Sequence, residues 1–213
     1  MEPRQVRSAA DARTIVEERG VPHVKVGAFD IDGIMRGKYI SRDKFLSSLD
    51  GGFGFCDVVL GWDGQDQLYD NVKYTGWHTG YPDAPVRILP DTCRELPFED
   101  NGLFFLGEFS PPGEVVCPRG LLRRVIERGR AMGFDAYAGL EYEFFVFRET
   151  PESVREKHYR NLTPMAPGWF GYSVIRNSTG SDFYRRLLDD CRNMDIAIEG
   201  LHEETGPGVM EAA

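Results

Sequence analysis

Apolar and polar residues follow two different spacings along the first half of the chain. Residues 8–19 show the helical spacing, with Ile15 and Val16 on the apolar side and Gly20 as the stop. Strands are predicted where apolar and polar positions alternate between turn-forming residues. The further elements expected here are strands at 24–32, 38–40, 86–90 and 102–109, and a helix at 41–49 capped by Ser41. Residues 50–84 are rich in Gly, Asp, Tyr and Trp, and they predict a long ordered loop.

The second half alternates helices with strands. Pro111-Pro112-Gly113 interrupts the chain, and we place a domain boundary there. The pattern after it predicts, in order, a helix at 118–132, a strand at 134–147, a helix at 180–194 and a strand at 196–201. Helices interleaved with strands in this way are typical of an α+β or α/β layer, and they exclude a helical bundle or a β-sandwich.

The net negative charge of the chain argues against nucleic-acid and membrane partners. The 213 residues are 41% hydrophobic and carry a net charge of −9. Nucleic acids and anionic membranes require a basic surface, so neither is an expected partner. The four cysteines are widely separated, which is neither a zinc pattern nor a disulfide framework. The N-terminal residues have no apolar core of a signal peptide, and we expect a cytoplasmic protein.

One pair of carboxylates lies on the strand predicted at 134–147. Side chains two positions apart on a strand point to the same side, so Glu141 and Glu143 leave one face together. Their mutual repulsion is relieved when a divalent cation that prefers oxygen ligands, Mg²⁺ or Mn²⁺, lies between them. An ordinary strand with one solvated face carries the same pair, and the pair alone does not decide between the two interpretations.

A second acidic segment begins at His202. It contains Glu203, then a Gly-Pro-Gly turn at 206–208, then Glu211. Glycine tolerates positive φ and proline fixes φ, so the chain can reverse sharply there and return Glu211 toward Glu203. A solvated acidic turn is the alternative interpretation of this segment taken alone.

Five segments in this order resemble the glutamine synthetase family. The two catalytic-domain motifs are G-L-E-Y-E-F-F-V-F at 139–147 and H-E-x-x-G-P-G-x-x-E at 202–211. The other three are D-I-D-G-I-M-R-G-K at 30–38, R-I-L-P-D-T-C-R-E-L-P-F at 87–98 and C-P-R-G-L-L-R-R-V-I at 117–126. The resemblance implies an α+β chain with a β-grasp domain at 20–110. The first part of a catalytic domain, with an antiparallel sheet and flanking helices, is then expected at 114–213.

The resemblance also implies a set of site residues. Glu143, Glu203 and Glu211 match carboxylates that hold a first Mg²⁺ or Mn²⁺, and Glu141 matches a ligand of a second metal beside ATP. Tyr172 matches a tyrosine near the ammonium pocket.

Three further residues are considered beside the predicted ligands. In the loop at 55–64, Asp57 is the nearest match to an aspartate that deprotonates ammonium in a neighbouring subunit's site, with Asp63 second. His202 precedes a predicted ligand and could support it without binding the metal.

The implied activity is ATP-dependent ligation of the γ-carboxylate of glutamate, or a similar acid, to ammonia or an amine through an acyl phosphate. This is the reaction of glutamine biosynthesis in nitrogen metabolism, and the family implies a homo-oligomeric double ring. Val209 replaces the family's usual glutamine, and the loop at 55–64 also departs from the family pattern. Both departures favour a γ-glutamyl-amine or polyamine ligase.

The position of the last residue raises another alternative. The family's ATP loop, second-metal histidine and substrate arginines would follow Ala213. We therefore expect a truncated chain that has no ligase activity alone, and a non-catalytic homologue with a structural or regulatory role is the remaining alternative.

Overall fold

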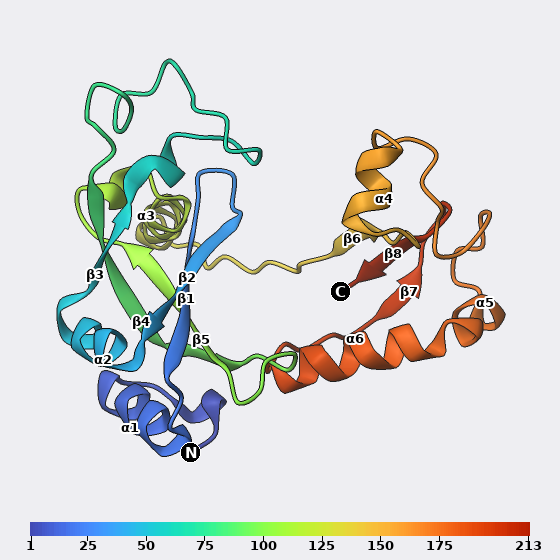
Figure 1. Ribbon diagram of the computed structural model, residues 1–213, viewed down its shortest axis with the longest axis horizontal. Helices are drawn as coiled ribbons and strands as arrows, with labels where there is room; N and C mark the ends of the chain where they lie inside the picture. Colours follow the sequence, from blue (N-terminus) through green and yellow to red (C-terminus); the bar gives the residue numbers. More distant parts are fainter. The chain divides into compact units, whose positions relative to one another are not determined.

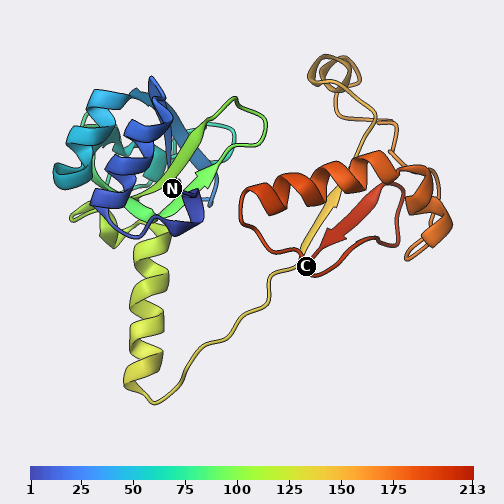
Figure 2. The same cartoon turned by 90° about the horizontal axis from the view of Figure 1, so that it is seen from below.

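The computed structural model describes all residues from Met1 to Ala213. The chain forms two compact units, Met1–Ala136 and Tyr137–Ala213, and each is described by itself (Figures 1 and 2). None of the helices is long and apolar enough to cross a membrane.

The first unit is built on a five-stranded sheet in the order β2-β1-β5-β4-β3. Strands β1 and β2 form an antiparallel hairpin, β1 and β5 run parallel at the centre, and β4 pairs antiparallel with both β5 and β3. The strands are β1 His23–Phe29, β2 Met35–Ser41, β3 Phe53–Cys56, β4 Asp83–Glu95 and β5 Leu103–Phe109. A parallel central pair flanked by hairpins is the β-grasp arrangement that the sequence predicts.

Two helices cover one face of this sheet, α1 Ala9–Arg19 and α2 Arg42–Gly51. Ser41 caps α2 as expected, with its side chain accepting a hydrogen bond from Lys44 N, and Ser8 caps α1 in the same way by accepting one from Asp11 N. Phe45 of α2 packs on Phe105 of β5 with ring centroids 4.7 Å apart, and both side chains are fully buried. Burying one such ring contributes roughly 1.5–3 kcal/mol, so this contact anchors the helices to the sheet.

The sequence predicts one long loop at 50–84, but the segment is not a loop throughout. Its first part forms β3 and a 3-10 helix, η2 Asp57–Leu60, before the irregular stretch that leads to β4. Phe53 and Phe55 of β3 are buried, and this short strand pairs with the start of β4 at the sheet edge. Burial alternates along Phe53–Cys56, which is the mark of a strand with one face on the core.

Helix α3, Pro118–Ala131, is held to the first unit by charged contacts. Glu108 of β5 is buried, and Arg123 of α3 donates to its Oε2 from 3.0 Å while Arg87 of β4 also pairs with it. Leu121 and Val125, part of the apolar stripe that predicted the helix, remain exposed. By its contacts the helix lies with the first compact unit, on the far side of the boundary that the sequence predicts at 111–113.

The second unit contains a three-stranded antiparallel sheet in the order β6-β8-β7. Helix α6, Ser181–Asn193, lies along one face of this sheet (Figure 2). The strands are β6 Tyr142–Phe145, β7 Leu201–Glu203 and β8 Val209–Ala212, and the short helices are α4 Pro151–Glu156 and α5 Val174–Thr179.

Both strands predicted in the second unit are shorter than expected. Only Tyr142–Phe145 of the stretch 134–147 is a strand, and 196–201 contributes only its last residue to β7. Strand structure requires a partner, and the continuous ladder of β6 forms only where β8 runs beside it, whereas Phe147 makes a single bridge to Pro164. Apolar alternation outside that range therefore does not form a strand in this unit.

Candidate metal centre

The hairpin between β7 and β8 brings the acidic residues together. Gly208 in its turn has φ +73°, and a Cβ at that position would lie 2.6 Å from the carbonyl oxygen of Val146. Only glycine fits such a close approach at positive φ. The turn returns Glu211 to a position directly opposite His202. The chain reversal predicted from the Gly-Pro-Gly sequence is therefore present.

The strand register aligns three side chains with potential metal-binding atoms across the sheet. Glu143 of β6 is paired with Glu211 of β8, and Glu211 is paired with His202 of β7. Directly paired residues project from the same face, so these three form one row. Glu141 lies two positions before Glu143. Its negative charge is one of the causes that raise the pKa of the Tyr172 hydroxyl.

Glu203 does not join this row. It is paired with Met210, so its side chain projects from the opposite face of the sheet. There it is 6% exposed, and its Oε1 accepts a hydrogen bond from the Tyr184 hydroxyl of α6 at 3.1 Å. Burial and the nearby carboxylate raise the pKa of Tyr184, which keeps the hydroxyl protonated as a donor. The sequence-predicted ligand is thus turned toward α6.

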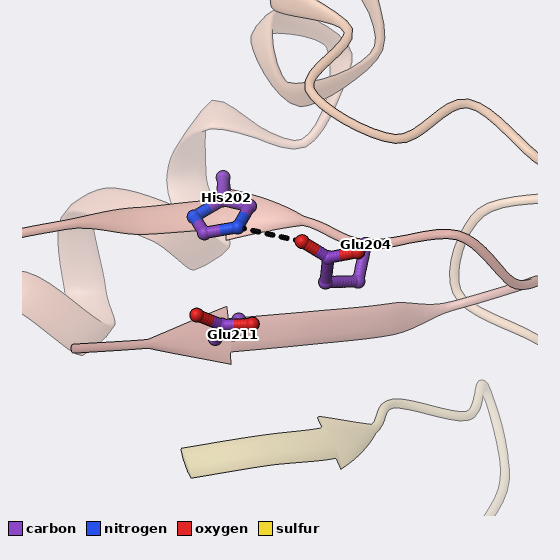
Figure 3. A group of neighbouring side chains, drawn as sticks. All are labelled: His202, Glu204 and Glu211. Atoms are coloured by element: carbon purple, nitrogen blue, oxygen red, sulfur yellow. Dashed lines mark hydrogen bonds and ion pairs between the residues drawn. The ribbon is translucent and has the colours of Figure 1, made fainter. Parts of the chain in front are cut away.

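Glu204 takes the position that the sequence analysis gave to Glu203. Its Oε1 lies 2.9 Å from His202 Nε2, and its Oε2 accepts a hydrogen bond of 3.1 Å from the Thr205 amide. The potential ligand atoms of His202, Glu204 and Glu211 all lie within 4.8 Å of one another (Figure 3). The sequence could have predicted this, because His202 and Glu204 are two positions apart on an extended segment and therefore point to the same side, whereas Glu203 between them points to the other.

Tyr172 is fixed beside this group by its backbone and its ring. It has φ +60°, a conformation that costs a non-glycine residue on the order of 1–3 kcal/mol. Its amide donates to the Glu203 carbonyl at 2.8 Å. Its ring is stacked on the His202 ring, with centroids 4.5 Å apart and planes 17° from parallel. Tyr172, which lies about 30 residues before the second acidic segment in the sequence, is therefore next to His202 in space.

Hydrogen bonding keeps the Glu204 carboxyl ionised. Its pKa is lowered, first by the Tyr172 hydroxyl, then by His202 and the Thr205 amide. The same contact raises the pKa of Tyr172, with further contributions from the charges of Glu211 and Glu141. An ionised Glu204 near Glu211, which is paired in register with Glu143, gives an oxygen-rich donor set that fits Mg²⁺ or Mn²⁺.

Asp57 and Asp63 lie in the first unit, and their carboxylates are engaged there. Asp57 is 4% exposed, and its Oδ1 accepts a 2.5 Å hydrogen bond from the Thr75 hydroxyl. Asp63 Oδ1 accepts hydrogen bonds from the amides of Gln65 and Gln67. Both residues therefore stabilise the segment 57–82 within its own unit, which is the local role that an aspartate in a turn commonly has.

The fold and the site together define an α+β protein with a β-grasp unit and a second sheet that carries a row of acidic residues. Residues 115–213 match the sequence model of the glutamine synthetase catalytic domain. Type-1 glutamine synthetase 2 of Dictyostelium discoideum is 45% identical over 195 residues, which is 90% of this chain and 37% of the relative. The chain belongs to the glutamine synthetase family.

Two further comparisons agree with this assignment. Glutamate–isopropylamine ligase of a Pseudomonas species is 32% identical over 206 residues, covering 93% of this chain and 44% of that protein. A ligand-free structure of GmaS has the same fold with a TM-score of 0.69 at 17% identity, covering 94% of this chain and 44% of that one. The chain thus spans less than half the length of these relatives. The expected fold class, a β-grasp unit followed by the first part of the catalytic domain, is confirmed.

Proposed function

We propose that the protein is a subunit of an ATP-dependent ligase that joins the γ-carboxylate of glutamate, or a similar acid, to ammonia or an amine. The curated relatives are ligases of this kind, which supports the reaction class. The observation that carries the proposal is the row of Glu143, Glu211 and His202 across three strands, with Glu204 beside it. An acyl phosphate formed from ATP would be the activated form of the acid.

Within this proposal, Glu143, Glu204 and Glu211 would hold the first divalent cation, and Glu141 would contribute to a second. Glu204 replaces Glu203 in the predicted set, because Glu203 lies on the other face of the sheet. A bound Mg²⁺ or Mn²⁺ would stabilise negative charge on the transferring phosphoryl group and on the substrate carboxylate. The carboxylates of this chain would bind the cation, and Tyr172 would lie beside the acceptor amine.

A feature of the hairpin favours an amine over ammonia as acceptor. Val209 alternates with Glu211 along β8, so both side chains belong to the same face. Val209 is 4% exposed and places an apolar side chain where the family usually has an amide. An apolar surface near the acceptor would favour an alkyl group, and one curated relative is named for isopropylamine ligation.

Assembly and location follow from the same proposal. We propose a homo-oligomeric ring in the cytoplasm, with glutamine biosynthesis as the alternative role when ammonia is the acceptor. Sedimentation of the purified protein measures the oligomer directly, and a monomer at micromolar concentration would contradict the ring.

The reaction is tested by phosphate release from ATP by the full-length protein. Glutamate is supplied with ammonia, isopropylamine or a diamine, each at the same concentration. The proposal predicts that release requires glutamate, an acceptor and Mg²⁺ or Mn²⁺, and that an alkylamine supports a higher kcat/KM than ammonia. Release that is independent of glutamate in every mixture would contradict it.

A further inference from the structure

Glu204 is held from several sides by groups that the proposed reaction leaves without a role. His202 Nε2 lies 2.9 Å from its Oε1, and the Thr205 amide donates to its Oε2. The His202 side chain is 24% exposed and that of Glu204 is 19% exposed, so water competes only in part for these contacts. Figure 3 shows the imidazole and the carboxylate edge to edge, with Glu211 on the neighbouring strand.

The imidazole is itself held in place by Tyr172. The two rings are stacked at 4.5 Å, and the Tyr172 amide is bonded to the Glu203 carbonyl of β7. The tyrosine is therefore attached by its backbone to the same strand that carries the histidine. Its positive φ is maintained in spite of the strain, which is common where a side chain must have one orientation for function.

We propose that Tyr172 and His202 form a positioning pair that orients the Glu204 carboxylate for the divalent cation, with His202 acting through Glu204. This inference rests on the proposed function, because it takes Glu204 as a metal ligand. A histidine nitrogen that hydrogen-bonds a ligating carboxylate fixes its rotamer, and loss of such a partner typically weakens metal binding by about 10–100-fold. The pair also links the acceptor side, where Tyr172 lies, to the metal side.

The geometry distinguishes this role from direct binding of the metal by His202. The Nε2 atom is engaged by Glu204, and the ring plane is covered by Tyr172. Binding through Nε2 would require the imidazole to release Glu204, and binding through Nδ1 is the alternative that ¹⁴N coupling would reveal. The positioning role requires no such change, since the contacts are already present.

The test measures Mn²⁺ binding to the purified 213-residue chain by calorimetry and pulsed electron paramagnetic resonance. His202→Phe keeps an aromatic ring for the stack and removes Nε2, and Tyr172→Leu removes both the stack and the hydroxyl that bonds Glu204. Glu204→Gln removes the ligand charge. His23→Phe, at an exposed histidine in the first unit, is the matched control.

We expect His202→Phe and Tyr172→Leu to weaken Mn²⁺ binding about tenfold, with His23→Phe unchanged. The double variant His202→Phe/Glu204→Gln should bind no more weakly than Glu204→Gln alone, because His202 acts through that residue. His202→Gln retains a polar group and should recover part of the affinity. The wild-type spectrum should lack the ¹⁴N coupling of a coordinated imidazole. Thermal melting of each variant confirms that it is folded.

Three results would overturn the positioning role: wild-type affinity in His202→Phe, additive losses in the double variant, or ¹⁴N coupling in the wild type. If Glu204→Gln weakens binding and His202→Phe does not, only the positioning pair is wrong. If Glu204→Gln binds Mn²⁺ like the wild type, or the wild type binds none, the ligand assignment fails and the inference fails with it.

Discussion

At the scale of single residues, Glu203 and Glu204 lie in different surroundings: Glu203 contacts Tyr184, and Glu204 lies beside His202 and Glu211. The sequence contains both carboxylates next to one histidine, and a match to the motif by its first residues selects Glu203. The pleat of β7 selects Glu204, because Glu203 is paired with Met210 on the face covered by α6. A shift of one residue along a strand moves a side chain to the opposite face.

The buried position of Glu203 leads to a prediction about stability. Tyr184→Phe removes the hydroxyl that donates to Glu203 Oε1 and leaves a buried carboxylate without that donor. The free energy of unfolding should fall by about 1–3 kcal/mol. Urea denaturation of the chain measures it, with Tyr137→Phe as a control because Tyr137 is 98% exposed. Equal stability of the two variants would show that the hydrogen bond contributes nothing.

Asp57 gives a second prediction at this scale. Thr75→Val preserves the shape of a fully buried side chain but removes the hydroxyl that donates to Asp57. The unfolding free energy of the first unit should decrease by about 1–3 kcal/mol, because the carboxylate stays buried with one donor fewer. Denaturation followed by tryptophan fluorescence reports the loss. An unchanged midpoint would favour a carboxylate that is free to act elsewhere, as the sequence analysis predicts for Asp57.

At the scale of elements, the β7–β8 hairpin and helix α3 show two different means of attachment. The hairpin depends on glycine geometry, and it sets the register that aligns Glu143, Glu211 and His202. Helix α3 depends on ion pairs to Glu108, while its apolar stripe stays exposed. The buried Glu108 carboxylate is costly to disturb, since its charge is balanced by several arginines at the edge of the unit.

The hairpin prediction concerns Gly208. In Gly208→Ala the new Cβ would meet the Val146 carbonyl oxygen at 2.6 Å, at a residue with φ +73°. The turn must shift, so the variant should lose at least about 1–3 kcal/mol of stability and also bind Mn²⁺ more weakly. Gly200→Ala is the matched control, because no atom lies within 4 Å of its added Cβ. If both variants behave like the wild type, the turn does not determine the site.

The ion pairs of Glu108 with the arginines around α3 should make the stability of the first unit depend on pH. Burial of Glu108 raises its pKa, but hydrogen bonds from Arg123 and Arg87 outweigh burial, so the pKa lies below its ordinary value of 4.5. A carboxyl with a lower pKa in the folded state stabilises the fold above pH about 4.5, and this contribution is lost as the pH falls through the folded pKa. The stability of Glu108→Gln should therefore change less than that of the wild type below pH 5. Parallel pH profiles, measured by urea unfolding, would contradict this.

At the scale of the whole molecule, the sequence predicted the order of elements well and their ends less well. The caps at Ser8 and Ser41 were predictable because a capping side chain bonds only its own first turn. The length of β6 was not, because strand formation at 134–141 depends on a partner far along the chain. The sheet register, and with it the choice of Glu204, is likewise decided by long-range pairing. Tyr172 lies beside His202 and Glu204 in the structure, while its place at an acceptor pocket stays a prediction.

The central claim is that one face of the β6-β8-β7 sheet binds a divalent cation through Glu143, Glu204 and Glu211. Calorimetric titration of the purified chain with Mn²⁺ tests it most directly, using Glu→Gln variants at these three positions and Glu203→Gln as the matched neighbour. The account predicts that each of the three weakens binding at least tenfold, whereas Glu203→Gln, which retains an oxygen for Tyr184, binds Mn²⁺ like the wild type. Loss of binding in Glu203→Gln together with wild-type affinity in Glu204→Gln would contradict the account.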